Sequence, residues 1–423
     1  MTSRLPLLAA LAAAACSSET ASVGRGYAPV LHTFSDPIRD LDVLFVVDDS
    51  GSMADDQRAL VEAARTQLFA QLAAQPDGMP NLHLAVVSSS VAVPHIPNCD
   101  AAPDGLFASC PQIAGTYLID VDDGAGGRTR NYTGTLDDAF ACAAMLGDQG
   151  CGLERPFDAL HRALDGSHAE NAGFLRDDAV LLIVFLTDED DGSVHDLYPY
   201  DFSRADDPFE SNSRGFEYGV VCDPDDDSLG PRTDCHARED SPYMVSVADT
   251  VAFLQHLKPD PAMVMVAGIV PPSDPVEVIN NFNGSQREIG PACIPPPGPC
   301  ADDPNQLCDR AGAAPAIRIH ELLDQFTTRY TFSSLCEDTM NLRVYRIARS
   351  ANAIMSNVPC LAIDHAVSAD QCRAFEVTAG GDRTRIPLDL VEDPTACDFT
   401  PTHLRAVTDT PAAGHHVEIE CVQ

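Results

Sequence analysis

The chain has 423 residues, with 64 Asp and Glu against 26 Lys and Arg, and a formal net charge of −38. Nucleic acid is bound by clustered Lys and Arg, so this charge argues against nucleic acid as a partner, and it also disfavours binding to anionic lipid headgroups through charge alone. The length is enough for one large or two medium domains, and an apolar content of 45% can fill a sizeable core.

The first residues have the features of an export segment. Arg4 precedes the apolar run 5–15, which is too short to span a membrane and fits a cleaved signal peptide. Cys16 follows, and the arrangement resembles the lipobox of bacterial lipoproteins, whose cysteine is acylated. Ala13 stands where such lipoboxes usually have leucine, so an ordinary secretory signal is the alternative. The lipobox implies an exported protein that reaches the membrane only through its N-terminal lipid, and Ser17 favours the bacterial outer membrane.

The cysteines favour an oxidising compartment. There are 15, and if Cys16 carries lipid, an even number of 14 remains for disulfides. In an exported chain such cysteines are far more often bridged than bound to metal. Short spacings predict three local bridges, which are Cys99–Cys110, Cys142–Cys151 and Cys222–Cys235.

Apolar runs alternate with amphipathic segments from residue 41 onwards. The runs 41–47 and 179–188 are continuous and followed by acids, which is typical of strands buried on both faces of a parallel sheet. The segment 54–74 places its apolar residues on one helical face, and Ser52 with Asp55 predicts a capping box before it. Further strands are expected at 82–90, 263–270 and 329–335, and further helices at 245–257, 317–326 and 341–354. The alternation predicts an α/β fold whose mostly parallel central sheet has helices on both faces and binds ligands beyond the carboxyl ends of its strands.

Other parts of the chain lack this pattern. Three segments that carry cysteines and few apolar runs are predicted to be loops, namely 91–135, 194–243 and 271–314. Close cysteines and the alternating run 415–422 predict a small, disulfide-stapled β-rich module near the C-terminus. The predicted organisation is a signal segment at 1–16, a polar tether at 17–38, the α/β domain at 39–355 and the β-rich module at 356–423.

A candidate metal site follows the first buried strand. Asp48, Ser50 and Ser52 form the pattern D-x-S-x-S directly after the run 41–47, with Gly51 in the turn. A strand end followed by a glycine turn points three oxygen groups towards one position, and Mg²⁺ prefers oxygen ligands in an octahedral shell that retains several waters. In the alternative, Ser50 and Ser52 only satisfy backbone groups at the start of a helix.

This strand, D-x-S-x-S and helix arrangement resembles the metal-ion-dependent adhesion site of von Willebrand factor type A (vWA) domains and integrin I domains. The resemblance implies a Rossmann-like vWA domain over about residues 38–354, similar to those of exported bacterial proteins with cysteine-rich C-terminal tails. It implies Mg²⁺, or alternatively Mn²⁺ or Ca²⁺, with an open position that takes an acidic side chain from a protein partner. In the family an aspartate after a later strand holds a metal-bound water, and Asp188 in the segment 185–191 occupies that position.

The family's remaining ligand is a threonine, and here the sequence departs from the pattern. In the segment 139–164, Asp148 follows Gly147 where similar proteins have the threonine. Either Asp148 replaces it, or Thr133 or Thr135 acts from an altered loop. A second direct carboxylate would lower the residual charge of the ion and weaken its capture of an acidic partner.

Two functions are therefore open, neither of them enzymatic. The first is a cell-envelope lipoprotein that binds a divalent cation at Asp48, Ser50, Ser52 and Asp188 and mediates protein–protein adhesion. The second is a structural or scaffolding envelope protein with a vestigial metal site. A hydrolase is disfavoured, because the sequence has no GxSxG motif and no phosphate-binding loop.

Overall fold

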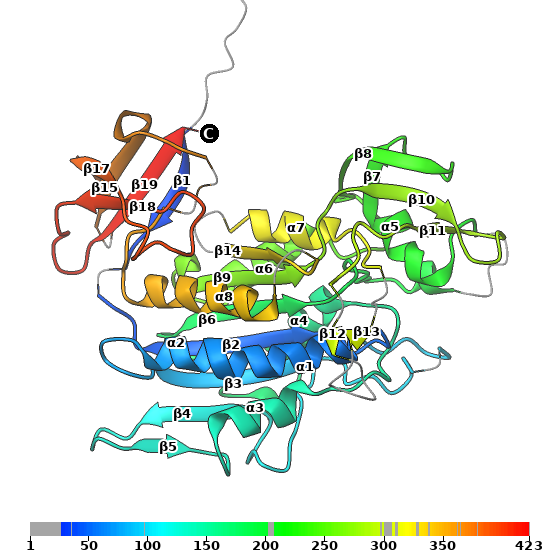
Figure 1. Cartoon of the computed structure of the whole chain (residues 1–423), viewed down its shortest axis with the longest axis horizontal. Coiled ribbons are helices and arrows are strands. Elements are labelled where there is room, and N and C mark those ends of the chain that lie inside the picture. The colour runs from blue at the N-terminus through cyan, green and yellow to red at the C-terminus, as the bar shows by residue number, and fades with distance from the viewer. Residues whose placement is uncertain are drawn as a thin grey trace, which may run out of the picture.

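The computed structural model describes residues 27–422 except 35, 97, 202–206, 297, 300–306, 309–311, 327–329, 337–338, 362, 364 and 379. Its centre is a seven-stranded sheet in the order β14-β9-β6-β2-β3-β4-β5 (Figure 1). Five strands run parallel, which are β2 (Asp40–Val47), β3 (Asn81–Ser88), β6 (Val180–Leu186), β9 (Val264–Val270) and β14 (Tyr330–Ser334). β4 (Leu118–Asp122) pairs antiparallel with β3, and the edge strand β5 (Arg128–Arg130) pairs antiparallel with β4.

Helices cover both faces of this sheet (Figure 1). One face carries α1 (Ala54–Ala63), the π-helical η1 (Ala64–Leu68), α2 (Phe69–Ala73), α3 (Leu136–Ala144) and α8 (Met340–Met355). The other carries α4 (Pro156–Leu164), α6 (Val247–His256) and α7 (Ile317–Asp324). The pleat of β2 supplies both cores, because Val43 and Phe45 face the first group and Leu44 and Val46 face the second. The mixed α/β class predicted from the sequence is confirmed, with a sheet that is part parallel and part antiparallel.

The three segments predicted to be loops contain strands, so that prediction is wrong in part. The first holds β4 and β5. The other two supply a separate antiparallel sheet of β7 (Val220–Asp223), β8 (Gly230–Ala237), β10 (Val276–Asn280) and β11 (Arg287–Ile289). β7, β10 and β11 are short, and the longer β8 begins with Gly230 and Pro231, so none of them shows a clear apolar and polar alternation. The same region includes α5 (Arg214–Gly219), β12 (Gly298–Pro299) and β13 (Leu307–Cys308).

The two ends of the described chain meet in one sheet (Figure 1). β1 (Tyr27–His32) pairs with β19 (His416–Val422), which continues to β15 (Cys372–Val377) and β16 (Arg383–Ile386). β17 (Leu388–Glu392) and β18 (Leu404–Thr408) form a hairpin beside it. The tether predicted at 17–38 is therefore wrong for β1, because its partner strand lies at the other end of the sequence and local composition cannot reveal it.

Single turns of 3₁₀ helix connect several of these elements. They are η2 (Ala169–Asn171), η3 (Tyr198–Tyr200), η4 (Ser211–Ser213), η5 (Pro261–Met263) and η6 (Ala369–Gln371). Within the described ranges, no helix is both long and apolar enough to cross a membrane. The signal segment 1–16, with Cys16, lies outside the described residues.

Six disulfides join cysteines of the described ranges. They are Cys99–Cys151, Cys110–Cys142, Cys222–Cys235, Cys293–Cys336, Cys360–Cys397 and Cys372–Cys421. Cys222–Cys235 is the predicted bridge. The predicted bridges Cys99–Cys110 and Cys142–Cys151 are wrong, because these four cysteines exchange partners. Tertiary packing brings Cys110 against α3, which carries Cys142, and places the loop after α3 against the segment that carries Cys99.

Candidate metal centre

The residues predicted to bind a metal lie together beyond the carboxyl ends of β2 and β6. These strands are parallel neighbours with Val47 opposite Leu186, so the loops that carry Asp48 and Asp188 leave the sheet side by side. The N–H of Asp48 donates to the carbonyl of Leu186 at 2.9 Å, which fixes the start of the first loop. Register alone therefore brings two carboxylates from distant parts of the sequence to one edge.

Asp48 is completely buried at the base of this site. Its Oδ1 accepts the N–H of Ser50 at 2.8 Å, and its Oδ2 accepts the hydroxyl of Thr187 at 2.7 Å. Burial raises the pKa of Asp48 to about 7, although the bonds from Ser50 and Thr187 act in the opposite direction. The Oγ atoms of Ser50 and Ser52 are 3.2 Å apart, and Ser52 hydrogen-bonds to the carboxylate of Asp188. All four predicted ligands thus belong to one connected cluster.

Two further carboxylates lie beside Asp48 and Asp188, which are the buried Glu154 and the half-buried Glu189. Burial, followed by repulsion between these acids, holds the pKa of both Asp188 and Glu154 well above its usual range. Among the described residues, no Lys, Arg or His forms an ion pair with any of the four. The Oδ1 of Asp188 and the Oε1 of Glu154 are buried without a hydrogen-bond partner. Buried charges are normally paired or bound to metal, so this donor set fits a divalent cation.

The next acids of the second loop have structural partners. Asp190 lies at the start of α7 and accepts the N–H groups of Arg318 and Ile319 at 3.0 and 3.1 Å. Asp191 and Arg318 form a fully buried ion pair, with 3.1 Å between Oδ2 and Nη2. Burial raises the pKa of Asp190 to about 7, against the effect of Arg318. These two residues fix the loop to α7 and thereby position Asp188.

A third loop, residues 145–152, is bonded directly to the first. Gln57 of α1 donates from Nε2 to the carbonyls of Asp48 and Gly147 at 3.0 and 2.8 Å, and its Oε1 accepts the N–H of Gly147 at 3.0 Å. The N–H of Gly150 donates to the carbonyl of Asp49 at 2.8 Å. The loop expected to supply the family's threonine therefore does lie beside the D-x-S-x-S turn.

Asp148 lies in this loop with an exposed side chain. Its backbone oxygen would be 4.0 Å from a Cβ on Gly51, whereas its exposed carboxylate accepts a bond from Gln149 Nε2 at 2.7 Å. Thr135 caps the N-terminus of α3, about 13 Å along the helix from this loop, and the N–H of Thr133 bonds to the carbonyl of Gln112. Asp148 is thus the neighbour of the cluster, and neither threonine belongs to it.

Several residues of the site were not singled out in the sequence. Thr187 precedes Asp188 directly, so the strand-end pattern contained a signal for it. No sequence pattern marks Asp49 as part of the site. Its Oδ1 accepts the hydroxyl of Ser90 at 2.7 Å, and Ser90 Oγ in turn accepts the N–H of Cys151 at 2.8 Å. The predicted capping box of Ser52 and Asp55 is wrong, because α1 begins after Met53 without a side-chain cap and Ser52 instead turns towards Asp188.

No protein-family model matches the chain, and no curated protein matches its sequence. Among solved structures, the open conformation of the pilus adhesin SpaC from Lactobacillus rhamnosus GG aligns with 92% of this chain at 10% sequence identity and a TM-score of 0.36. The alignment spans 39% of that adhesin's length. A likeness this weak assigns neither a family nor a function, so the function has to be inferred from the site itself.

Proposed function

We propose that the chain carries a vWA-like domain that binds a divalent cation, Mg²⁺ in the first instance, at Asp48, Ser50, Ser52 and Asp188. The observation that supports this most strongly is the buried Oδ1 of Asp188, which has no hydrogen-bond partner in a cluster of carboxylates without a balancing cation. Mg²⁺ would supply that charge, and the two serine hydroxyls and water would complete its oxygen shell.

The surroundings favour adhesion as the use of such an ion. Gly51 and Ser52 are exposed, so the site is open to solvent on one side. The carboxylate of Asp148 is exposed and accepts a bond from its neighbour Gln149, so water surrounds this charge. We propose that an acidic side chain of a protein partner binds the cation from this open side.

We further propose that the protein is exported and lipid-anchored in the bacterial envelope through Cys16. The six disulfides support an oxidising compartment. Labelling of producing cells with a fatty acid analogue tests the anchor. The wild-type chain should carry label, and a Cys16→Ser chain should not.

Calorimetry tests the metal site. Mg²⁺ is titrated into the metal-free full chain and into Asp48→Ala, with Asp148→Ala as the matched control. We expect one ion per chain, loss of the heat in Asp48→Ala, and an affinity within about 3-fold of wild type in Asp148→Ala, because a partner outside the shell contributes little. Equal, negligible heats in wild type and Asp48→Ala would overturn the proposal.

A pull-down from the producing cell's envelope, with and without chelator, tests adhesion. The alternative is a scaffolding protein with a vestigial site, and one observation favours it. Glu154 and Glu189 hydrogen-bond to each other, so a shared proton can stabilise these two acids without a metal ion. Partners that are captured equally with and without chelator would support the scaffold.

A further inference from the structure

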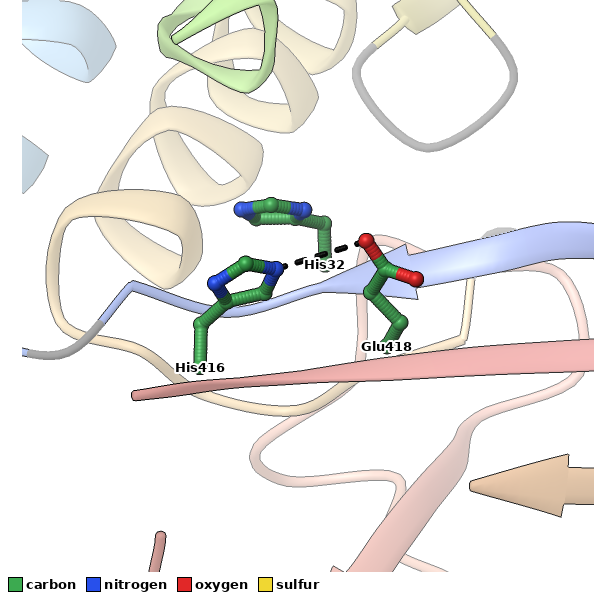
Figure 2. A group of neighbouring side chains, drawn as sticks. All are labelled: His32, His416 and Glu418. Carbon is green, nitrogen blue, oxygen red and sulfur yellow. Dashed lines mark hydrogen bonds and ion pairs between the residues drawn. The ribbon is translucent and has the colours of Figure 1, made fainter. Parts of the chain in front are cut away.

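A second group of metal-ligating side chains lies where β1 and β19 approach the amino ends of the central strands. It consists of His32, His416 and Glu418, each of which offers a ligand atom within 4.8 Å of the other two (Figure 2). All three side chains are partly buried. None belongs to the site described above, which lies beyond the opposite ends of β2 and β6.

Strand pairing, rather than a loop, places these residues together. His32 is directly opposite Glu418 in the antiparallel pairing of β1 with β19. His416 lies two residues before Glu418, so the pleat puts all three side chains on one face of the sheet. Val417 and Ile419 point to the other face, where they pack in the core of this sheet. The ligand set is therefore held by the backbone of two paired strands.

Neighbouring groups orient two of the three side chains. Asp260 is not one of the three ligands, but its Oδ2 lies 3.4 Å from His32 Nε2. At this ion-pair distance the carboxylate can orient the imidazole of His32. Arg383 holds Oε2 of Glu418 at 3.0 Å, which leaves Oε1 facing His416 Nε2 at 3.3 Å. A carboxylate behind a histidine is the usual arrangement around protein-bound metals. The two imidazoles are stacked, with 4.2 Å between their ring centroids, and Figure 2 shows the carboxylate of Glu418 beside them.

The group borders a cavity of about 460 Å³ that is rich in acids. His32 and His416 line it together with four aspartates, which are Asp36, Asp40, Asp178 and Asp260. The one cationic side chain in the lining, Arg39, donates to the carbonyls of Gly78 and Met79. The cavity thus has negative charge to attract a cation and room for water ligands.

We propose that His32, His416 and Glu418 bind a divalent transition-metal ion, for which Zn²⁺ is the best match. Imidazole nitrogen is a preferred ligand of Zn²⁺ and a poor one for Mg²⁺ and Ca²⁺, and two histidines with one carboxylate form a common zinc donor set. Burial, with the neighbouring His32, lowers the pKa of His416. The bound ion would join the N-terminal strand to the C-terminal sheet at their contact with the α/β body.

Titration of Zn²⁺ into the metal-free full chain tests this site, with Mg²⁺ kept in excess to occupy the other one. We expect one Zn²⁺ per chain, at least about 100-fold weaker binding in His416→Ala and Glu418→Gln, and about 10-fold weaker binding in Asp260→Asn. His415→Ala is the matched control. It removes the adjacent imidazole, which bonds to Glu376 Oε1 at 2.7 Å, and should leave affinity within about 3-fold of wild type.

Substitution by Co²⁺ gives a second readout, since its visible absorption reports imidazole and carboxylate coordination directly. Absence of stoichiometric Zn²⁺ binding in the wild-type chain would overturn the proposal, as would wild-type affinity in both His416→Ala and Glu418→Gln. If circular dichroism shows that His416→Ala is misfolded, Glu418→Gln alone decides. Zn²⁺ binding that persists in Asp48→Ala separates this site from the proposed Mg²⁺ site.

Discussion

A methyl group at Gly150 should test whether the 145–152 loop is coupled to the candidate Mg²⁺ site. A Cβ there would lie 2.2 Å from Asp49 Oδ1 and 2.5 Å from the carbonyl oxygen of Asp49. Ordinary contacts begin near 3.4 Å, so the two segments would have to separate by about 1 Å. Neither atom can swing away easily, because the carbonyl is backbone and Oδ1 is bonded to Ser90 Oγ at 2.7 Å.

The magnitude follows from this overlap. Overpacking of a well-packed site costs about 1–3 kcal/mol, which corresponds to a fall of several degrees in Tm. Asp49 lies between the proposed ligands Asp48 and Ser50, and metal–ligand distances tolerate only about 0.2 Å. A separation near 1 Å should therefore reach the ion, and we expect Gly150→Ala to bind Mg²⁺ at least about 10-fold more weakly.

Calorimetry with Mg²⁺ and thermal unfolding in chelator provide the two measurements. Gly152→Ala is the control, because it adds the same methyl two residues away where no heavy atom lies within 4 Å. It should behave as wild type in both. A Gly150→Ala chain with the Tm and Mg²⁺ affinity of Gly152→Ala would refute the close approach of the loop to Asp49, and a lowered Tm with unchanged affinity would refute its coupling to the metal.

Three further predictions concern the stability of the α/β domain. Replacement of Cys99 and Cys151 by serine opens a bridge of sequence separation 52 and should cost up to about 4 kcal/mol, measured by urea unfolding; peptide mapping of the wild type should recover this pair. Asp42→Ala should destabilise the fold by about 3–5 kcal/mol in the same assay, because it leaves the buried ammonium of Lys258, 3.1 Å from Asp42 Oδ2, without its carboxylate. Phe140→Ala should cost about 3–5 kcal/mol through the cavity it leaves among the helices on one face of the sheet, with the midpoint of the urea transition as readout.

The sequence predicts helices and strands correctly where a single local pattern identifies them. The runs at 41–47 and 179–188 become β2 and β6, and the helical periodicity of 54–74 continues through α1, η1 and α2. The placement of Asp48 and Asp188 at one edge follows from the parallel pairing of these strands, which buried apolar runs already indicate. Both acids can therefore be assigned to one site from the sequence.

Prediction fails where a property depends on partners that are distant in the sequence. Cys110 bonds to Cys142 rather than to the nearer Cys99, because topology and not spacing decides which thiols meet. β1 is a strand only because β19 pairs with it. Glu154 cannot be assigned to the site from the sequence either. Its local sequence does not distinguish a carboxylate buried beside the candidate Mg²⁺ site from an ordinary charge before a helix.

The two proposed sites lie at opposite ends of the same strand, and this arrangement separates the two ions. β2 begins at Asp40, which lines the cavity beside His32, and is followed by Asp48 at the candidate Mg²⁺ site. Eight residues of strand separate them by about 26 Å. β1 precedes β2 in the chain and ends at His32, which lines the same cavity as Asp40. We therefore expect the two sites to bind their ions independently, and the persistence of Zn²⁺ binding in Asp48→Ala tests this.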